Sequence, residues 1–419
     1  LPIYSDFLGE KQFIPFVQSI YSKLHQNDPG NNFFGSFKFI FIGCATNCFV
    51  SPLSIYSVLT QLLAGSEKNT REEILRTLKL ESCQALGITI QFVCEHITLG
   101  LKGGQATDIT QANGIFLQSG FGILDSYPRS IEEHFGASSI EVDYVKNPDD
   151  SRHTINQWIE NQTNGKIKEL LPDGVISSQT TFVLTSALYF KGEYKLFLYI
   201  FEGTWKEKFA PAASKPAKFY LLNGDEMDIT MMQSRRKLRF AQFENGLGCR
   251  VVRLPFERHE MIIVLPNANN GLNPLLQKLL EPSQNQSLHN ILSRKGYHEA
   301  EVRLRLPKFK LTKGSSQDLK ATLCSLGMPS AFDASKADFS GITGRRDLHL
   351  SAMFHKAVIE VDENGAEAAA ATAAVANRCC MPINMPQDFF VDHPFLFFIV
   401  SDSGLPIFMG HVVEPEPNC

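Results

Sequence analysis

Apolar positions near the start of the chain recur with helical spacing. Residues 13–24 carry apolar side chains three to four positions apart, which predicts an amphipathic helix. The string FVSPLSIYSVLTQLLAGS predicts a short strand and then a helix that stops at Gly65. Farther on, Thr70 and Glu73 have the spacing of a capping box, which predicts the start of another helix.

Strand-like runs dominate the later part of the chain. The string TTFVLTSALYFKG predicts a long strand buried on both faces, and CRVVRLPF, HEMIIVLP and VRLRLPKFKL predict further strands. Helices come early, strands come mostly late, and there is no regular βαβ alternation, internal repeat or linker. The pattern therefore predicts an α+β architecture in one domain over residues 1–419.

Composition limits the classes of partner. The chain has 419 residues, is 43% hydrophobic and carries a net charge of −4, which gives no electrostatic reason to expect nucleic acid or an anionic membrane as a partner. No apolar run approaches the ~18 residues of a membrane span. The chain begins at Leu1, so we expect no signal peptide within it. We also expect a monomer.

Cysteines and glycosylation motifs leave the compartment open. Nine cysteines are an odd number and sparse for this length, which argues against a disulfide scaffold. Sequons begin at Asn161 and Asn285 and would carry glycans only in a secreted glycoprotein. We expect an extracellular location, with a cytoplasmic one as the alternative. Cys44 and Cys48 have neither the spacing of a zinc ribbon nor a nearby histidine, so we expect no metal and no cofactor.

The segment 357–397 contains an alanine-rich run with two interpretations. Alanine has the highest helix propensity, which favours a helix. If Gly365 is instead a hinge and the run enters a sheet, small side chains alternate on one face and Glu367 points to the other. Small side chains would also let such a strand pass between two existing strands.

Several strings in this chain resemble the serpin family of serine protease inhibitors. They are ENGAEAAAATAA, DHPFLFFI and GLPIFMGHVVEP near the end of the chain, and FVSPLSI, LLAGS and TNGKI earlier. The resemblance implies the serpin fold, with three β-sheets including a large central one, about eight or nine helices and an exposed reactive-centre loop at about residues 363–388.

The resemblance also implies a mechanism. In serpins a protease attacks the loop and forms an acyl-enzyme, and the cleaved loop then inserts as an extra strand before the ester is hydrolysed; loop insertion is a known case of stored strain. The chain has no G-x-S-x-G, H-E-x-x-H or P-loop motif, so we expect an inhibitor and not an enzyme. The alternative is a non-inhibitory serpin that acts as a carrier, chaperone or storage protein.

Residue roles follow from the resemblance alone. The hinge corresponds to Glu363, Gly365, Ala366, Glu367, Ala368, Ala369, Ala370, Ala371 and Thr372. The breach, where the loop first enters the sheet, and the shutter, the polar cluster beneath the sheet, correspond to Trp205, Lys308, Ser51, Ser54, Ser186 and His355. The shutter of serpins usually has Asn at the position of Ser186, so we expect a weaker hydrogen-bond network in this chain.

Two scissile bonds remain open. The common serpin spacing from Glu363 predicts cleavage after Cys379, between Cys379 and Cys380. A trypsin-like protease has an acidic specificity pocket that suits arginine, which favours cleavage between Arg378 and Cys379. We prefer the second bond and therefore a trypsin-like target.

Two basic clusters and two insertions complete the predictions. The basic clusters suggest weak binding of an anionic polysaccharide, against the simpler interpretation of solvated strand faces; they are Arg235, Arg236, Lys237, Arg239, Arg303, Arg305, Lys308 and Lys310. Residues 35–49 and 193–203 interrupt the serpin pattern with apolar, aromatic sequence. We interpret one or both as sequence that does not belong to the natural protein, because loops are normally polar.

Overall fold

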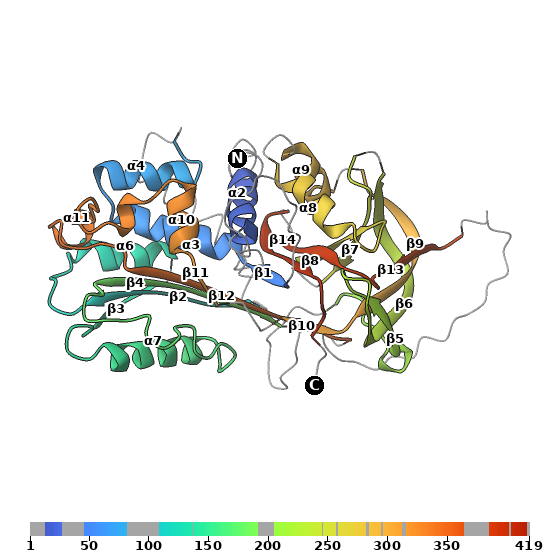
Figure 1. Cartoon of the computed structure of the whole chain (residues 1–419), viewed down its shortest axis with the longest axis horizontal. Coiled ribbons are helices and arrows are strands. Elements are labelled where there is room, and N and C mark those ends of the chain that lie inside the picture. The colour runs from blue at the N-terminus through green and yellow to red at the C-terminus, as the bar shows by residue number, and fades with distance from the viewer. Residues whose placement is uncertain are drawn as a thin grey trace.

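The structure is a computed structural model of the whole chain. It describes residues 13–26, 46–81, 109–135, 137–191, 205–244, 246–256, 259–281, 285–294, 296–311, 316–363, 385–401 and 404–416. Within these ranges the chain forms nine α-helices and two hydrogen-bonded β-sheets. The two sheets lie at opposite ends of the molecule (Figure 1).

The first sheet has six strands in the order β10-β12-β4-β2-β3, and β11 pairs with β12. The strands are β2 (Ile109–Gln118), β3 (Ser138–Val142), β4 (Phe182–Lys191), β10 (Phe309–Leu311), β11 (Ser316–Asp318) and β12 (Ala352–Val361). Central strands β4 and β12 run parallel, with pairs from Ala352 opposite Val183 to Glu360 opposite Lys191. The strand predicted from TTFVLTSALYFKG is β4.

Helices cover both faces of the six-stranded sheet (Figure 1). On one face, α7 (Pro148–Gln162) packs Ile155 and Ile159 against strand residues such as Val183 in a small separate core. On the other face, α3 (Pro52–Ala64) is buried along nearly its whole length and belongs to the main core. Two buried faces explain why β4 and β12 read as almost continuous apolar runs.

The second sheet has nine strands in the order β1-β15-β14-β8-β7-β6-β9-β13, with β5 paired to β6. They are β1 (Cys48–Val50), β5 (Lys215–Tyr220), β6 (Glu226–Phe243), β7 (Cys249–Pro255), β8 (His259–Pro266), β9 (His298–Pro307), β13 (Gln387–Phe390), β14 (Phe395–Ser401) and β15 (Pro406–Val412). The long β6 pairs with β5, β9 and β7 in turn, which joins two of the three expected sheets into one.

The remaining helices pack around these sheets. They are α2 (Phe13–Gln26), α4 (Lys68–Thr77), α6 (Ser126–Phe135), α8 (Leu272–Leu280), α9 (Asn285–Leu292), α10 (Lys320–Leu326) and α11 (Ser340–Thr343). The helix predicted over residues 13–24 is α2. The predicted capping box is wrong, because α4 begins before Thr70. The carboxylate of Glu73 instead accepts hydrogen bonds from the backbone and hydroxyl of Ser330.

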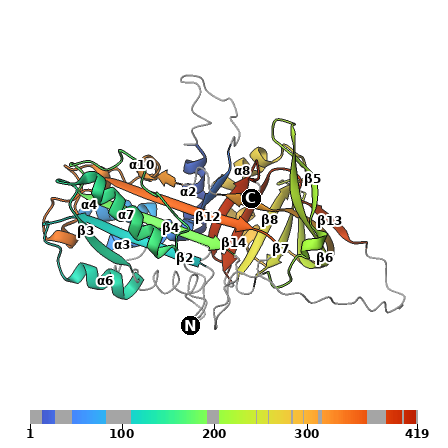
Figure 2. The same ribbon diagram turned by 90° about the horizontal axis from the view of Figure 1, so that it is seen from below.

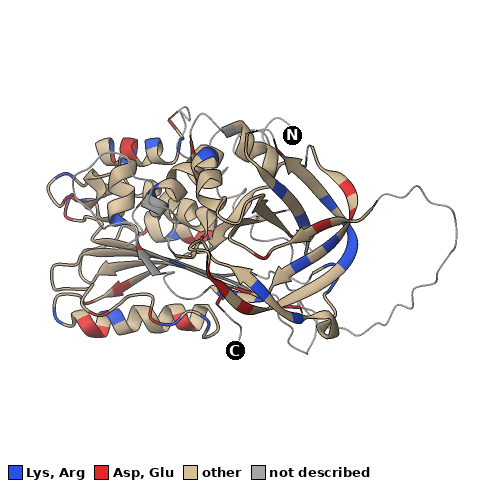
Figure 3. Ribbon diagram, turned by 45° about the vertical axis from the view of Figure 1, so that its right-hand side comes forward, with Lys and Arg blue, Asp and Glu red and all other residues tan. Residues whose placement is uncertain are grey.

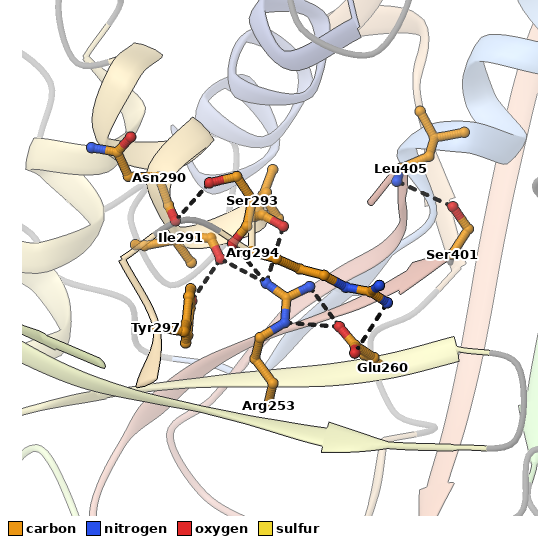
Figure 4. A network of polar contacts seen from close by, with 10 residues as sticks. Arg253, Glu260, Asn290, Ile291, Ser293, Arg294, Tyr297, Ser401 and Leu405 are labelled. Atoms are coloured by element: carbon orange, nitrogen blue, oxygen red, sulfur yellow. Dashed lines mark hydrogen bonds and ion pairs between the residues drawn. The ribbon is translucent and has the colours of Figure 1, made fainter. Parts of the chain in front are cut away.

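Arg253 on β7 organises a buried polar network at the end of α9 (Figure 4). Its guanidinium forms an ion pair with Glu260 at 2.7 Å and donates to the carbonyls of Leu292 and Ser293 at 3.1 and 3.0 Å. Arg294 donates to the other oxygen of Glu260 at 3.2 Å. Because the last carbonyls of a helix lack partners within the helix, a cation here stabilises α9 and fixes it to β7 and β8.

Candidate functional site

The candidate site is the seam between β4 and β12, which run side by side in both views (Figures 1 and 2). The chain leaves β12 at Val361, and Glu363 is the last residue described before residues 364–384. The description resumes at Met385, just before β13 in the other sheet. The predicted reactive-centre loop therefore starts at one end of the seam and returns at the nine-stranded sheet.

Lys308 and Glu363 meet at the end of the seam. The Lys308 ammonium lies 2.6 Å from a Glu363 carboxylate oxygen, and the Ser214 hydroxyl donates to the other oxygen at 2.6 Å. The Glu363 side chain is only 9% exposed. Burial opposes ionisation of Glu363, but the hydrogen bonds from Lys308 and Ser214 outweigh it and lower its pKa. The ion pair is therefore largely buried.

Trp205 lies beside this ion pair and is 2% exposed. Its ring stacks on Phe256 with centroids 4.2 Å apart and meets Phe209 edge-on. Its indole N–H donates to the carbonyl of Asp362 at 3.1 Å. Trp205 therefore holds the backbone at the start of the loop. The preceding insertion, 193–203, lies outside the described residues.

Four predicted shutter residues meet in the middle of the seam. Ser51 precedes α3 and donates its backbone N–H to His355 Nε2 at 3.0 Å, while its hydroxyl donates to the carbonyl of Ile407 at 2.8 Å. The Ser54 and Ser186 hydroxyls are 2.5 Å apart. Ser186 lies directly opposite His355 in the seam, with 3.3 Å between Oγ and Nδ1. Ser186 thus keeps the network connected in place of the usual asparagine.

His355 is fully buried, and burial lowers its pKa to about 4. Because Nε2 accepts the N–H of Ser51, the proton of the neutral ring belongs on Nδ1, facing the Ser186 hydroxyl. A second proton on Nε2 would oppose the N–H of Ser51. The shutter is therefore a neutral hydrogen-bonded cluster near pH 7.

The sequence reasoning missed Asn113 on β2. Its amide oxygen is 3.4 Å from the Ser54 hydroxyl, and Asn113 lies opposite Ser186 across β2 and β4. The available signal in the sequence was an asparagine in the middle of the strand-like string ITQANGIFL, a residue that the structure then shows to be buried. Asn113 on β2 thus provides a side-chain amide one strand away from Ser186 on β4, the position where serpins usually carry an asparagine.

Other predictions fall outside the described residues. The hinge from Gly365 to Thr372, both candidate scissile bonds at residues 378–380 and the choice between helix and strand for the alanine run all lie within 364–384. Most of the 35–49 insertion is also outside, but its last two residues, Cys48 and Phe49, belong to β1 and pair with His411 and Gly410 of β15.

Among the described residues, no group of three or more His, Cys, Asp or Glu side chains is placed to hold a metal ion. No helix in those same ranges is both long and apolar enough to cross a membrane. The described cysteines Cys48, Cys249 and Cys324 form no disulfide, and burial raises the pKa of the Cys249 thiol to about 12.

Comparison with known proteins gives a consistent result. The family model "Serpin (serine protease inhibitor)" matches residues 43–415. The chain is 35% identical over 375 residues to human leukocyte elastase inhibitor, which covers 88% of the chain and 94% of that protein. It is 36% identical over 386 residues to human Serpin B3, with coverage of 88% and 94%.

Solved structures show the same fold. The crystal structure of Serpin48 of the insect Tenebrio molitor matches with a TM-score of 0.78 and 27% identity, covering 96% of this chain and 97% of the other. Uncleaved ovalbumin matches with a TM-score of 0.77 at 22% identity, covering 96% and 98%, which shows the fold alone.

The chain belongs to the serpin family. The predicted family and the serpin fold are confirmed, and the nine described helices agree with the eight or nine expected. The family model and the human leukocyte elastase inhibitor are named as inhibitors, which confirms that the chain belongs to a family of protease inhibitors and is not an enzyme. None of the comparisons supports the finer prediction of a trypsin-like target.

Proposed function

We propose that this chain inhibits serine proteases as a suicide substrate, with residues 364–384 as the segment that the protease attacks. The observation that carries the proposal is the parallel pairing of β4 with β12 at the point where the loop departs. A segment that turns back after Glu363 enters the sheet antiparallel to β12. Because β4 runs parallel to β12, the inserted strand is antiparallel to β4 as well.

This geometry makes insertion favourable. One parallel interface between β4 and β12 is exchanged for two antiparallel interfaces, and antiparallel pairing is slightly more stable per residue. The backbone groups of the loop also gain strand partners in place of water. A cut in the loop frees one end, so the gain is available only after the protease has acted.

The chemistry then depends on timing. The protease serine attacks the carbonyl of the scissile bond, the peptide bond breaks, and the new amino terminus leaves while the inhibitor stays attached as an ester. Insertion carries this ester along the seam before water can hydrolyse it. The small side chains of Ala366, Ala368 and Ala370 suit passage between two strands.

Two specificities are supported by different observations. Arg378 suits the acidic pocket of a trypsin-like protease, and on this ground we propose the bond Arg378-Cys379. Cys379-Cys380 is the second candidate. A small side chain fits the small pocket of an elastase, and the relatives named above include inhibitors of leukocyte elastase.

The test incubates the full chain with trypsin, chymotrypsin and elastase and looks for a complex that survives SDS. Mass spectrometry of the released peptide then identifies the bond, since the peptide starts at Cys379 or at Cys380. Ala370→Arg is the blocking variant, because an unpaired charge on the inserting face costs several kcal/mol.

We expect the wild type to form the complex and Ala370→Arg to be cleaved without one. A wild type that is cleaved by every protease and forms no complex would instead be the non-inhibitory carrier, chaperone or storage serpin. Ala368→Arg, on the same predicted face, repeats the test, and Glu367→Arg on the opposite face is the matched control.

We also propose an extracellular location, based on the sequons. Asn161 is exposed in the last turn of α7, where a glycan would extend into solvent. Treatment of the natural protein with a glycan-removing amidase should lower its mass. An unchanged mass, with Asn161 and Asn285 both unmodified in peptide maps, would favour the cytoplasmic alternative.

A further inference from the structure

The basic clusters predicted from the sequence separate in the structure. One group gathers on the exposed face of β6 and β9 (Figure 3), and we call it the basic face: Arg235, Lys237, Arg239, Arg303 and Arg305. The other three cations lie elsewhere. Arg236 points away from this face and stacks on Phe209, while Lys308 and Lys310 pair with Glu363 and Glu360.

The strand register concentrates positive charge on the basic face. Arg235 lies directly opposite Arg303, and like charges in such a pair destabilise a sheet. Each of the two has an acidic partner, Glu301 at 2.8 Å for Arg235 and Asp388 at 2.5 Å for Arg303. These ion pairs balance the central pair of arginines.

Three cations of the basic face remain without an ion pair among the described residues: Lys237, Arg239 and Arg305. The last of these stacks on the ring of Phe390, which leaves its charge uncompensated. The chain as a whole carries a net charge of −4, so the positive excess here is local. A local excess of one sign on an exposed sheet is suited to bind a surface of the opposite sign.

The basic face adjoins the returning end of the loop. Strand β13 pairs with β9, with Asp388 opposite Arg303, and begins two residues after Met385. The candidate scissile residues precede Met385 by six or seven positions, a span of about 25 Å at most when fully extended. A protease attached to the loop therefore lies close to β9 and β13.

We propose that the basic face binds an acidic surface of the target protease, outside the protease active site, and accelerates formation of the initial complex. This inference rests on the proposed inhibitory function. The acidic side chains of Glu299, Glu301 and Asp388 interleave with the cations of the face. A protein surface can match such mixed charges with its own, whereas a uniformly anionic polysaccharide would meet like charge at these three positions.

The test compares an anionic with a cationic trypsin. The charge variant replaces Lys237, Arg239 and Arg305 with Gln, and the control variant replaces Arg129, Lys146 and Lys168, exposed cations near α6, β3 and α7, with Gln. Both variants change the net charge equally. The second-order inhibition rate constant is measured at low and high salt. Equilibrium binding is measured with each trypsin after its active-site serine is replaced by alanine.

We expect the charge variant to lose about ten-fold in rate and affinity toward anionic trypsin at low salt, and little toward cationic trypsin. The difference should shrink at high salt because screening weakens exposed charges. The control variant should behave as the wild type.

Equal values for the charge and control variants would overturn the inference. So would a charge variant that retains its rate with anionic trypsin but loses binding to heparin, which would identify a polysaccharide site. Binding to the inactive trypsins needs neither acylation nor insertion. Loss of covalent complexes with the binding difference intact would therefore overturn the proposed function alone.

Discussion

Two seams between neighbouring strands differ in what they bury. At the centre of the seam between β8 and β14 the opposed residues are apolar and inaccessible, as in the pairs Ile263 with Phe397 and Ile262 with Phe398, and polar residues occur only at one end. Between β4 and β12 the register instead places Ser186 opposite His355 at the centre. Both seams are buried at their centres, but only the second contains hydrogen-bonding side chains there.

The hydrogen bonds in the β4–β12 seam show how it could part. His355 accepts from the backbone of Ser51, and Ser186 bonds Ser54, so the shorter bonds run from each strand to α3 or its N-terminal cap. The bond that crosses the seam, between His355 and Ser186, is longer at 3.3 Å. Separation of the strands would break the backbone ladder between them, but among these side-chain hydrogen bonds it would break only the weaker one and leave the stronger ones in place.

The largest effect should come from cleavage of the loop. Insertion adds a strand to the six-stranded sheet and fills the β4–β12 seam, so the cleaved chain should melt on the order of tens of degrees above the intact one. Scanning calorimetry before and after limited proteolysis near Arg378 measures the shift. Equal melting temperatures would show that the seam does not open, and the contrast with the β8–β14 seam would then have no functional meaning.

Truncation of a side chain in the β8–β14 seam should lower stability without affecting inhibition. Ile263→Ala removes a buried side chain between Phe397 and Val252, at a cost of about 2–5 kcal/mol. Chemical denaturation measures the loss, and titration of a protease measures the inhibition stoichiometry. We expect the stoichiometry at a permissive temperature to stay unchanged. A rise would show that the two seams are coupled.

Acid should destabilise the folded chain through His355 in the β4–β12 seam. Burial lowers the pKa of His355 from its ordinary value of 6.5 to about 4. At pH values between these two, the unfolded chain therefore binds a proton at His355 that the folded chain does not. Stability is thus fully present above about pH 6.5 and falls as the pH drops, by about 2 kcal/mol at pH 5.

His355→Gln provides the comparison for this acid effect. Urea denaturation at pH 7.5 and 5 should show a smaller loss in the variant than in the wild type. Burial also lowers the pKa of His349, and that contribution remains in both proteins and cancels. Identical losses in the two proteins would mean that His355 does not sense pH within the seam.

The sequence predicted some elements of the fold and some residues of the β4–β12 seam but missed others, and each miss has a physical reason. Strong periodicity and the family strings placed β4 and α3. The sequence did not reveal Asn113, because its contact with Ser54 joins segments far apart in the chain. The capping box failed because Glu73 has a tertiary partner, Ser330, and local spacing carries no information on distant partners.

The smallest effect we predict concerns the end of the β4–β12 seam. Lys308→Met removes the partner of Glu363, whose carboxylate is buried and retains only Ser214, at a cost of about 1–2 kcal/mol. The pKa of Glu363 is lowered in the wild type, so the pair contributes stability above about pH 4.5 that is lost as the pH falls through the folded pKa. A double-mutant cycle with Glu363→Gln isolates this coupling at pH 7. A looser end should also let the loop enter the seam more readily, so the inhibition rate should rise as stability falls. The expectation would be contradicted by a coupling energy near zero despite a loss of stability in Lys308→Met, or by slower inhibition in that variant. Either result would show that this pair positions the loop and does not restrain it.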